Sequence, residues 1–326
     1  MKKLITCFIA LILLIVPFSG CGEEDTISVN EVTHSVFYAP MYVAMEKGYF
    51  EEENVSISLT NGGGADKVMT AVVSGDADIG LCGPETVIYV RAQGKLDAPK
   101  VFAQLTQKDG AFLISRTNEK ENFSLNNLKN KDILAGREGG VPAMSFEYAM
   151  KEAGLTRNVD YTLNFGVQFN MMTPAFESGT SDYVTMFEPS ASEFEKAGKG
   201  YIVASMGELS GELPYTSFIA LDSFLKDNEE KALAFIRAIK KGYDFIANNT
   251  DLAVAQAIKG QFAGTSVESL AISVKNYRAI GAWKSDLKAT ETSFTRLQNI
   301  MEFAGELPVR FSFSELVDNS LVDKAL

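Results

Sequence analysis

Ser74-Gly75-Asp76-Ala77-Asp78-Ile79-Gly80-Leu81-Cys82-Gly83-Pro84-Glu85 contains a helix end, a turn, a short apolar strand and the start of another helix. Gly75 suits the left-handed position that ends a helix, here expected over 65–74. Ile79 to Cys82 is apolar throughout, as in a strand buried on both faces. This order of elements is typical of a parallel sheet covered by helices.

The same alternation extends in both directions and restarts in the middle of the chain. It predicts two α/β units, because strand and helix patterns follow each other at about 25-residue steps. The expected strands cover 27–36, 55–59, 79–82, 132–135, 161–165 and 183–187, and the expected helices cover 41–47, 65–74, 143–153, 173–177 and 190–196.

Two further strand-like runs, 111–115 and 216–221, bracket the second unit. We interpret them as strands that cross between two lobes. The predicted fold class is therefore α/β, with two doubly wound lobes joined by two crossing strands. Lobe 1 is predicted to be discontinuous (30–112 and 220–326), and lobe 2 to cover 113–219. In the mostly helical last third, 231–247 and 294–303 have apolar residues at the spacing of packing faces.

The N-terminus has the pattern of an export signal. Lys2 and Lys3 precede an apolar run, 4–18, that is shorter than the ~20 residues of a membrane span. Phe18-Ser19-Gly20-Cys21 resembles a bacterial lipobox, which implies lipidation of Cys21. The prediction is a leader over 1–20 and a tether over 21–29, placing the chain on the outer face of a bacterial membrane. A plain signal peptide or a membrane anchor with a chance cysteine is the alternative.

Composition excludes several classes of protein. A net charge of −12 disfavours nucleic acid or an anionic membrane surface as a partner. Outside the leader and Cys21, Cys82 is the only cysteine, and His34 is the only histidine of the chain. The mature chain therefore cannot form an internal disulfide, a cysteine metal cluster or a multi-histidine site. We predict no metal and no cofactor, and a monomer.

Ser178-Gly179-Thr180-Ser181-Asp182 leads into an apolar strand and then Glu188-Pro189, which repeats the pattern of 74–85. Duplication and similar turn chemistry explain this equally well. Either way, both lobes are expected to present the same kind of sheet edge.

Ligands of open parallel sheets bind beyond the carboxyl ends of the strands, where helices begin. Two facing edges make a cleft that a hinge can close. In this sequence those edges carry aromatic, glycine, glutamate and amide residues, with Arg137 as the only strong base near them. This chemistry favours an aminated heteroaromatic ligand over a sulfonate or nitrate. The predicted ligand-binding residues are Phe37, Tyr38, Gly63, Gly64, Glu85, Thr86, Gly140, Gln168, Asn170 and Glu188.

Each of these residues also has a structural interpretation. A glutamate in the first turn of a helix is favoured by the helix dipole without any ligand, and glycines are common in turns. We expect Met171, Met172 and Trp283 to be packing residues, and His34 to be a hydrogen-bonded residue at a strand end.

Tyr38-Ala39-Pro40-Met41-Tyr42-Val43-Ala44-Met45-Glu46-Lys47-Gly48-Tyr49-Phe50 resembles the opening signature of the NMT1/THI5-like substrate-binding proteins of ABC importers. Gly63 to Lys67, residues 74–85, Pro142 and Phe187-Glu188-Pro189 continue the resemblance over most of the mature chain. It implies the type II periplasmic-binding fold, and partnership with an ABC permease and ATPase. It also implies a ligand among thiamine-pyrimidine precursors, riboflavin, or taurine and alkanesulfonates.

Some related fungal proteins are enzymes that synthesise the thiamine pyrimidine with an active-site histidine and a cysteine-rich iron-binding run. This chain lacks such a run and has one histidine. A purely adhesive lipoprotein would not need paired glycine- and glutamate-bearing strand edges. We therefore predict a non-enzymatic solute-binding protein that captures an aminopyrimidine-like molecule between its lobes. The alternatives are a binder of taurine or an alkanesulfonate, nitrate or riboflavin, and, more remotely, a pyrimidine-synthesising enzyme.

Overall fold

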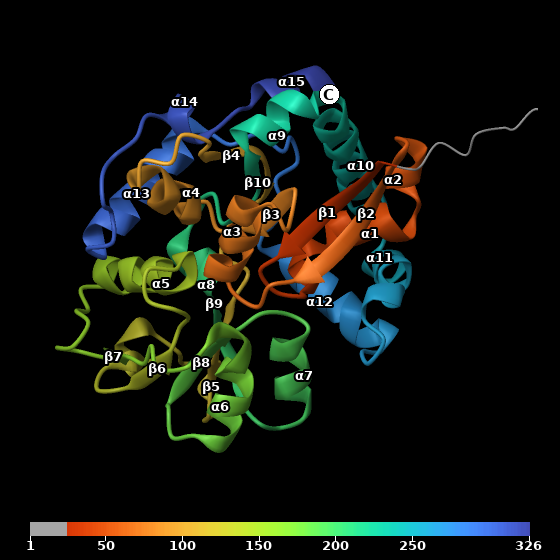
Figure 1. The fold of residues 1–326 in the computed structure, drawn as a ribbon. Coiled ribbons are helices and arrows are strands. Elements are labelled where there is room, and N and C mark those ends of the chain that lie inside the picture. The colour runs from red at the N-terminus through yellow and green to blue at the C-terminus, as the bar shows by residue number, and fades with distance from the viewer. Residues whose placement is uncertain (1–24) are drawn as a thin grey trace, which may run out of the picture.

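Two five-stranded sheets organise the computed structural model, which describes residues 25–326 (Figure 1). The predicted leader and Cys21 lie outside the described residues. The strands are β1 Asp25–Glu31, β2 Val55–Asn61, β3 Ile79–Cys82, β4 Pro99–Thr106, β5 Phe112–Ser115, β6 Asp132–Leu134, β7 Thr162–Leu163, β8 Tyr183–Met186, β9 Tyr201–Ser205 and β10 Thr216–Leu221. Residues 25–29, predicted to belong to the tether, are the first part of β1 instead, because their backbone pairs with β2.

Helices fill most of the sequence between the strands. The shorter elements are η1 Val36–Tyr38, α2 Tyr49–Glu52, η2 Leu125–Leu128, η3 Phe169–Met171, α8 Met206–Ser210, α9 Asp222–Asp227, η4 Lys259–Gln261, α14 Phe313–Leu316 and α15 Ser320–Ala325. The longer ones are α1 Ala39–Glu46, α3 Ala65–Ser74, α4 Glu85–Ala92, α5 Val141–Glu152, α6 Met172–Ser178, α7 Ser190–Lys196, α10 Glu229–Asn248, α11 Asp251–Ala257, α12 Val267–Ala279 and α13 Glu291–Phe303.

The first sheet has the order β2-β1-β3-β10-β4 and the second β7-β6-β8-β5-β9. In each sheet three neighbouring strands are parallel, and a fourth strand, β10 or β5, is antiparallel to both of its neighbours. The sheets are therefore mixed, whereas the sequence pattern predicted parallel ones. The antiparallel strands are the two that were predicted to cross between the lobes.

The chain passes between the sheets over residues 107–111 and 206–215, just before β5 and β10. Each of these two strands lies wholly in one sheet, so the crossings are made by the segments that precede them. A segment arriving from the other lobe enters its sheet from the opposite end, which accounts for the antiparallel direction. The prediction also omitted β4 and β9, which complete the two sheets.

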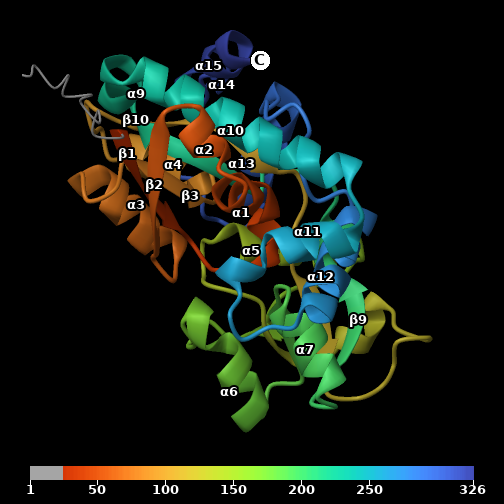
Figure 2. The ribbon, with the colours of Figure 1, turned by 90° about the vertical axis from the view of Figure 1, so that its right-hand side faces the viewer.

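Packing around β3 shows how the local sequence produces the fold. Gly75 ends α3 with φ of 82°, a conformation that glycine adopts without strain. A Cβ at Gly80 of β3 would lie 2.9 Å from a side-chain methyl of Val72 on α3, so glycine permits the close approach of helix and strand. In Figure 2, α3 lies on one side of β1 and β2, while α1, α2 and α10 lie on the other. The first lobe is thus doubly wound.

A candidate ligand site between the lobes

A cavity of about 150 Å³ lies between the lobes. Cavities of ~150 Å³ accommodate one benzene-sized ring. Its walls come from the strand-to-helix edges of both sheets and from the start of β10. The lining residues are Val32, Gly63, Gly64, Ala65, Asp66, Lys67, Gly83, Glu85, Arg137, Gly140, Val141, Pro142, Gln168, Phe169, Phe187, Tyr215 and Thr216.

Glu85, the first residue of α4, provides a buried acid in this cavity. Its side chain is 1% exposed, and its Oε1 accepts a hydrogen bond of 3.3 Å from the Val141 backbone N–H of the other lobe. Its Oε2 is also buried and has no hydrogen-bond partner among the described residues. Burial raises the pKa of Glu85 to about 7, against the smaller opposing effect of backbone N–H groups. A donor on a ligand would satisfy this oxygen.

A second buried acid, Asp109, lies on the first crossing segment. It accepts hydrogen bonds from the Ala111 N–H (2.8 Å) and the Ser145 hydroxyl (2.9 Å). Burial raises its pKa to about 7, and Tyr215 on the other crossing segment lies close enough to influence it. The two crossing segments therefore meet beside the cavity, through Asp109 and Tyr215.

Aromatic rings form one wall. Phe169 and Phe187 both line the cavity, with ring centroids 5.9 Å apart in an edge-to-face arrangement. Such rings offer apolar surface to a flat ligand.

The two lobes touch each other around the cavity. The Arg137 guanidinium of the second lobe lies 3.7 Å from the Asp66 carboxylate of the first. The Tyr89 hydroxyl donates to the Gly139 carbonyl at 2.7 Å. Arg137 is thus already paired, and Lys67 is the other cation in the lining. The Arg137–Asp66 pair is partly exposed, and pairs of that kind contribute at most ~1 kcal/mol.

Glu188, predicted as the counterpart of Glu85, is placed differently. It is 1% exposed and does not line the cavity. Its carboxylate accepts hydrogen bonds from the Ser192 hydroxyl (2.6 Å), the Ser192 N–H (3.0 Å) and the Asn276 amide (2.7 Å). In this structure it acts as a connector between α7 and α12.

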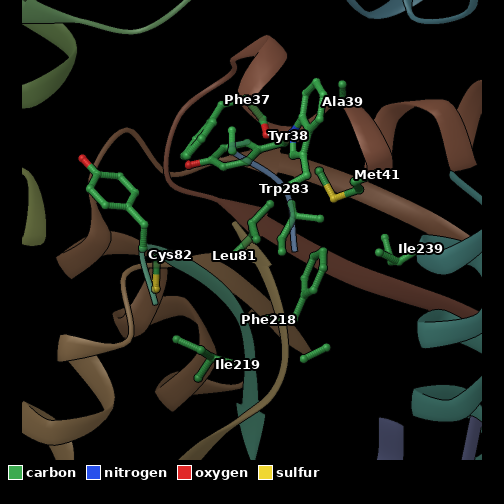
Figure 3. Close-up of a cluster of buried hydrophobic side chains, with 14 of the residues drawn as sticks. Phe37, Tyr38, Ala39, Met41, Leu81, Cys82, Phe218, Ile219, Ile239 and Trp283 are labelled. Atoms are coloured by element: carbon green, nitrogen blue, oxygen red, sulfur yellow. Dashed lines mark hydrogen bonds between the residues drawn. The ribbon is translucent and has the colours of Figure 1, made fainter. Parts of the chain in front are cut away.

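Phe37 and Tyr38 lie in the core behind the cavity, at 0% and 1% exposure. Figure 3 shows them beside Trp283, whose indole N–H donates to the Phe37 carbonyl at 2.9 Å. The Phe37 ring also contacts Phe187 of the wall, with centroids 5.6 Å apart. Phe37 therefore supports the wall from behind, and it is held there as the middle residue of the 3-10 helix η1.

The remaining predicted residues divide into two groups. Gly63, Gly64, Gly140 and Gln168 line the cavity. Thr86 lines a separate recess between α3 and α4, and its hydroxyl donates to the Gly83 carbonyl at 2.7 Å. Asn170 is outside the lining but close to Gly63. A Cβ added to Gly63 would lie 3.5 Å from the side-chain amide nitrogen of Asn170. Ligand contact by any of these residues stays a prediction.

Sequence reasoning overlooked several lining residues. Thr216 was taken as the first residue of a crossing strand, and Tyr215 was given no role. The strand pattern of 216–221 does not indicate that its first residue lies at a cavity. Phe187 precedes Glu188 in the repeated motif, and that position was the available signal. Asp66 and Lys67 come just after Gly64 and Ala65, in the first turn of α3.

His34 has the strand-end role that was expected. Its ring nitrogens lie 2.7 Å from Glu31 Oε1 and 2.9 Å from the Gln261 carbonyl. Within residues 25–326, no group of three or more His, Cys, Asp or Glu side chains is arranged to hold a metal ion. None of the helices in that range is both long and apolar enough to cross a bilayer.

Solved structures of two-lobed binding proteins share this fold. The nitrate-binding protein NrtA of Synechocystis PCC 6803 superposes with a TM-score of 0.75 at 14% identity, over 93% of this chain and 88% of that one. The alkanesulfonate-binding protein SsuA of Xanthomonas axonopodis pv. citri, bound to MOPS, gives 0.71 at 13% identity, over 90% and 98%. At these identities the likeness concerns the fold alone, which is that of the periplasmic binding proteins.

The sequence itself identifies the family. Residues 36–253 match the family model described as NMT1/THI5 like, and the chain belongs to this family. It is 42% identical to YtlA of Bacillus subtilis (strain 168), whose name describes it as a binding protein, over 96% of this chain and 94% of that one. It is 26% identical to the 4-amino-5-hydroxymethyl-2-methylpyrimidine phosphate synthase of Aspergillus parasiticus, over 84% and 81%.

Proposed function

We propose that this protein is the substrate-binding component of an ABC import system and that it captures a small aminated heteroaromatic molecule between its lobes. The observation that carries the ligand class is the buried, unpartnered Oε2 of Glu85 in the interlobe cavity. A buried acceptor without a partner is costly, so a ligand donor placed there gains the full benefit of pairing it. Ligand binding would then hold the two lobes together.

The size and walls of the cavity support a single ring. The volume suits a six-membered ring, and Phe169 and Phe187 offer apolar surface for it. An amino substituent directed at Glu85 supplies the donor. The family name and the synthase relative agree with pyrimidine chemistry. A sulfonate or nitrate ligand would place its negative charge beside Glu85 and is disfavoured unless that residue is protonated.

The relationship to YtlA supports a binding role rather than catalysis. The export signal and Cys21 support a lipid-anchored location on the outer face of a bacterial membrane, where a permease and an ATPase would complete the importer. Mass spectrometry of the membrane-extracted protein tests the anchor: diacylation at Cys21 is expected, and a free N-terminus at another residue would contradict it.

Glu85→Gln is expected to weaken binding of 4-amino-5-hydroxymethyl-2-methylpyrimidine about 10- to 100-fold, as measured by calorimetry on the chain from residue 23 onward. The glutamine is isosteric, so its oxygen can still accept from Val141 N–H. Its amide then turns a donor toward the ligand amino group and replaces an acceptor with a repulsive contact.

The exposed Glu121→Gln serves as the matched control and is expected to bind normally. A panel with thiamine, riboflavin, taurine and nitrate accompanies the pyrimidine. Binding of taurine or nitrate alone would keep the transport role and refute the ligand class. Unchanged affinity of Glu85→Gln for the pyrimidine would remove Glu85 from the site.

A further inference from the structure

A second buried polar group at the cavity is the hydroxyl of Tyr215. Tyr215 lines the cavity and is 4% exposed. Its hydroxyl interacts with the Asp109 carboxyl, although the two groups do not reach ideal hydrogen-bond geometry, and no other described group pairs with it. Buried hydroxyls normally make a well-formed hydrogen bond, and an exception needs an explanation. A ligand in the adjoining cavity is the partner that this location offers.

The ring of Tyr215 is held in place from several sides. Its backbone N–H donates to the Thr106 carbonyl at 3.3 Å, next to the start of β10. Its ring packs edge-on against Phe37, with centroids 5.8 Å apart, and against Phe187 at 6.3 Å. The hydroxyl therefore cannot swing out to water without disturbing the core. Its position in the cavity is preorganised, and preorganised groups lose less entropy on binding.

The neighbouring Asp109 sets the electrostatic environment of this hydroxyl. Burial, and next the charge of Asp109, raise the pKa of Tyr215 well above its ordinary value, so the phenol keeps its proton. A carboxylate beside a phenol attracts the phenolic proton to its own side. The oxygen lone pairs of Tyr215 are then left for the cavity. Ser145 and the Ala111 N–H hold Asp109 in position.

We propose that Tyr215 is a second recognition residue, whose oxygen accepts a hydrogen bond from a ligand donor distinct from the one at Glu85. The ligand is then a heteroaromatic amine with a second donor, such as a hydroxymethyl group, on another ring position. This inference rests on the proposed function and narrows its ligand class. A ring without the second donor leaves the Tyr215 oxygen buried and unpaired, and sites of that kind discriminate strongly against such analogues.

The proposed contact between Tyr215 and the ligand lies where the two crossing segments meet. Asp109 lies in the first segment and Tyr215 in the second, so the ligand's second donor is bound at the junction of the lobes. The contact therefore selects among ligands at the place where the lobes are connected.

The experiment compares wild type and Tyr215→Phe with two probes, 4-amino-5-hydroxymethyl-2-methylpyrimidine and 4-amino-2,5-dimethylpyrimidine, which lacks the hydroxyl. Wild type is expected to bind the hydroxymethyl probe about tenfold more tightly than the dimethyl probe. Tyr215→Phe is expected to lose this preference and to bind the dimethyl probe as wild type does. Its melting temperature should stay within about 2 °C of wild type, because the only internal interaction lost is the one between this hydroxyl and Asp109.

The outcomes separate this inference from the proposed function. A retained preference for the hydroxymethyl probe in Tyr215→Phe, with Glu85→Gln weakened, would refute the role of Tyr215 and leave the proposed function standing. Normal binding by Glu85→Gln together with a lost preference in Tyr215→Phe would remove Glu85 from the site and keep the role of Tyr215. Failure of both pyrimidines to bind wild type would overturn both. A large fall in the melting temperature of Tyr215→Phe would show that the hydroxyl is a structural group.

Discussion

The ligand-free protein is expected to lose stability as the pH rises from 5 to 8. Glu85 and Asp109 are buried, and burial raises the pKa of each to about 7. Between their unfolded and folded pKa values, the native state binds more protons than the unfolded state, so the free energy of unfolding falls with rising pH. Their contribution is complete below about pH 4 and is lost by about pH 8.

Each carboxyl is expected to contribute at most about 3 kcal/mol to this change, since one pKa unit corresponds to ~1.4 kcal/mol. His34 acts in the same direction, because its pKa is also raised, by hydrogen bonds to Glu31 and Gln261 that outweigh its partial burial. Glu53 and Glu119 act in the opposite direction, because ion pairs and hydrogen bonds lower the pKa of each. Their effect is confined to more acid solution, below about pH 4.5.

Urea unfolding at pH 5, 6, 7 and 8 measures this slope. Glu85→Gln and Asp109→Asn are each expected to flatten it and to be more stable than wild type at pH 8, because neither glutamine nor asparagine ionises. The double variant should retain only the contributions of His34 and of Glu147, a carboxyl whose pKa is also raised by burial. Equal stability of wild type at pH 5 and 8 would mean that both carboxyls are solvated or ionised in the folded protein. Greater stability of a binding-impaired Glu85→Gln would also show that the loss of affinity is not a loss of folding.

Phe37→Ala is expected to lower the free energy of unfolding by about 3–5 kcal/mol, the usual cost of truncating a buried phenylalanine. The side chain is 0% exposed, and its ring contacts Tyr38, Phe187, Tyr215 and Tyr277. Its removal leaves a cavity under the ligand-site wall, and neighbouring rings fixed in β strands and helices cannot refill it.

Denaturant unfolding of Phe37→Ala, Phe169→Ala and Leu96→Ala checks this assignment. Leu96 is fully exposed and should change stability by no more than about 0.5 kcal/mol. Phe169 lines the cavity, so its truncation should weaken ligand binding more than it changes unfolding. If Phe37→Ala unfolded at the wild-type urea concentration and lost ligand affinity, Phe37 would be a direct ligand contact, as its place after the first strand predicted.

The sequence predicted correctly those helices and strands whose ends are marked by neighbouring residues. The helices at 65–74 and 190–196 and the strand at 79–82 occur at the predicted residues, because glycine turns and apolar runs mark their ends. The strands at 99–106 and 201–205 were missed. Pro99, Lys100 and Gln104 interrupt the apolar pattern of the first, so its place beside β10 depends on pairing across the sheet.

The comparison of Glu85 with Glu188 shows what local patterns leave open. Both follow the third strand of a sheet, but Glu85 comes after its proline and Glu188 before it. This one-residue difference directs one carboxylate into the cavity and the other toward Ser192 and Asn276. The partners of Glu188 lie on α7 and on α12, 88 residues away, and no local pattern predicts that meeting.

The sequence by itself determined the class of this protein: two α/β lobes, glycine-bearing strand ends and the family signature all depend on local spacing. Only the tertiary structure decided which residues form the site. Phe37 and Tyr38 lie in the core, while Tyr215 of one crossing segment lines the cavity and interacts with Asp109 of the other segment, about 100 residues away in the chain. The physical reason is that burial and pairing depend on contacts distant in sequence, whereas turns, strands and helix ends depend on neighbours.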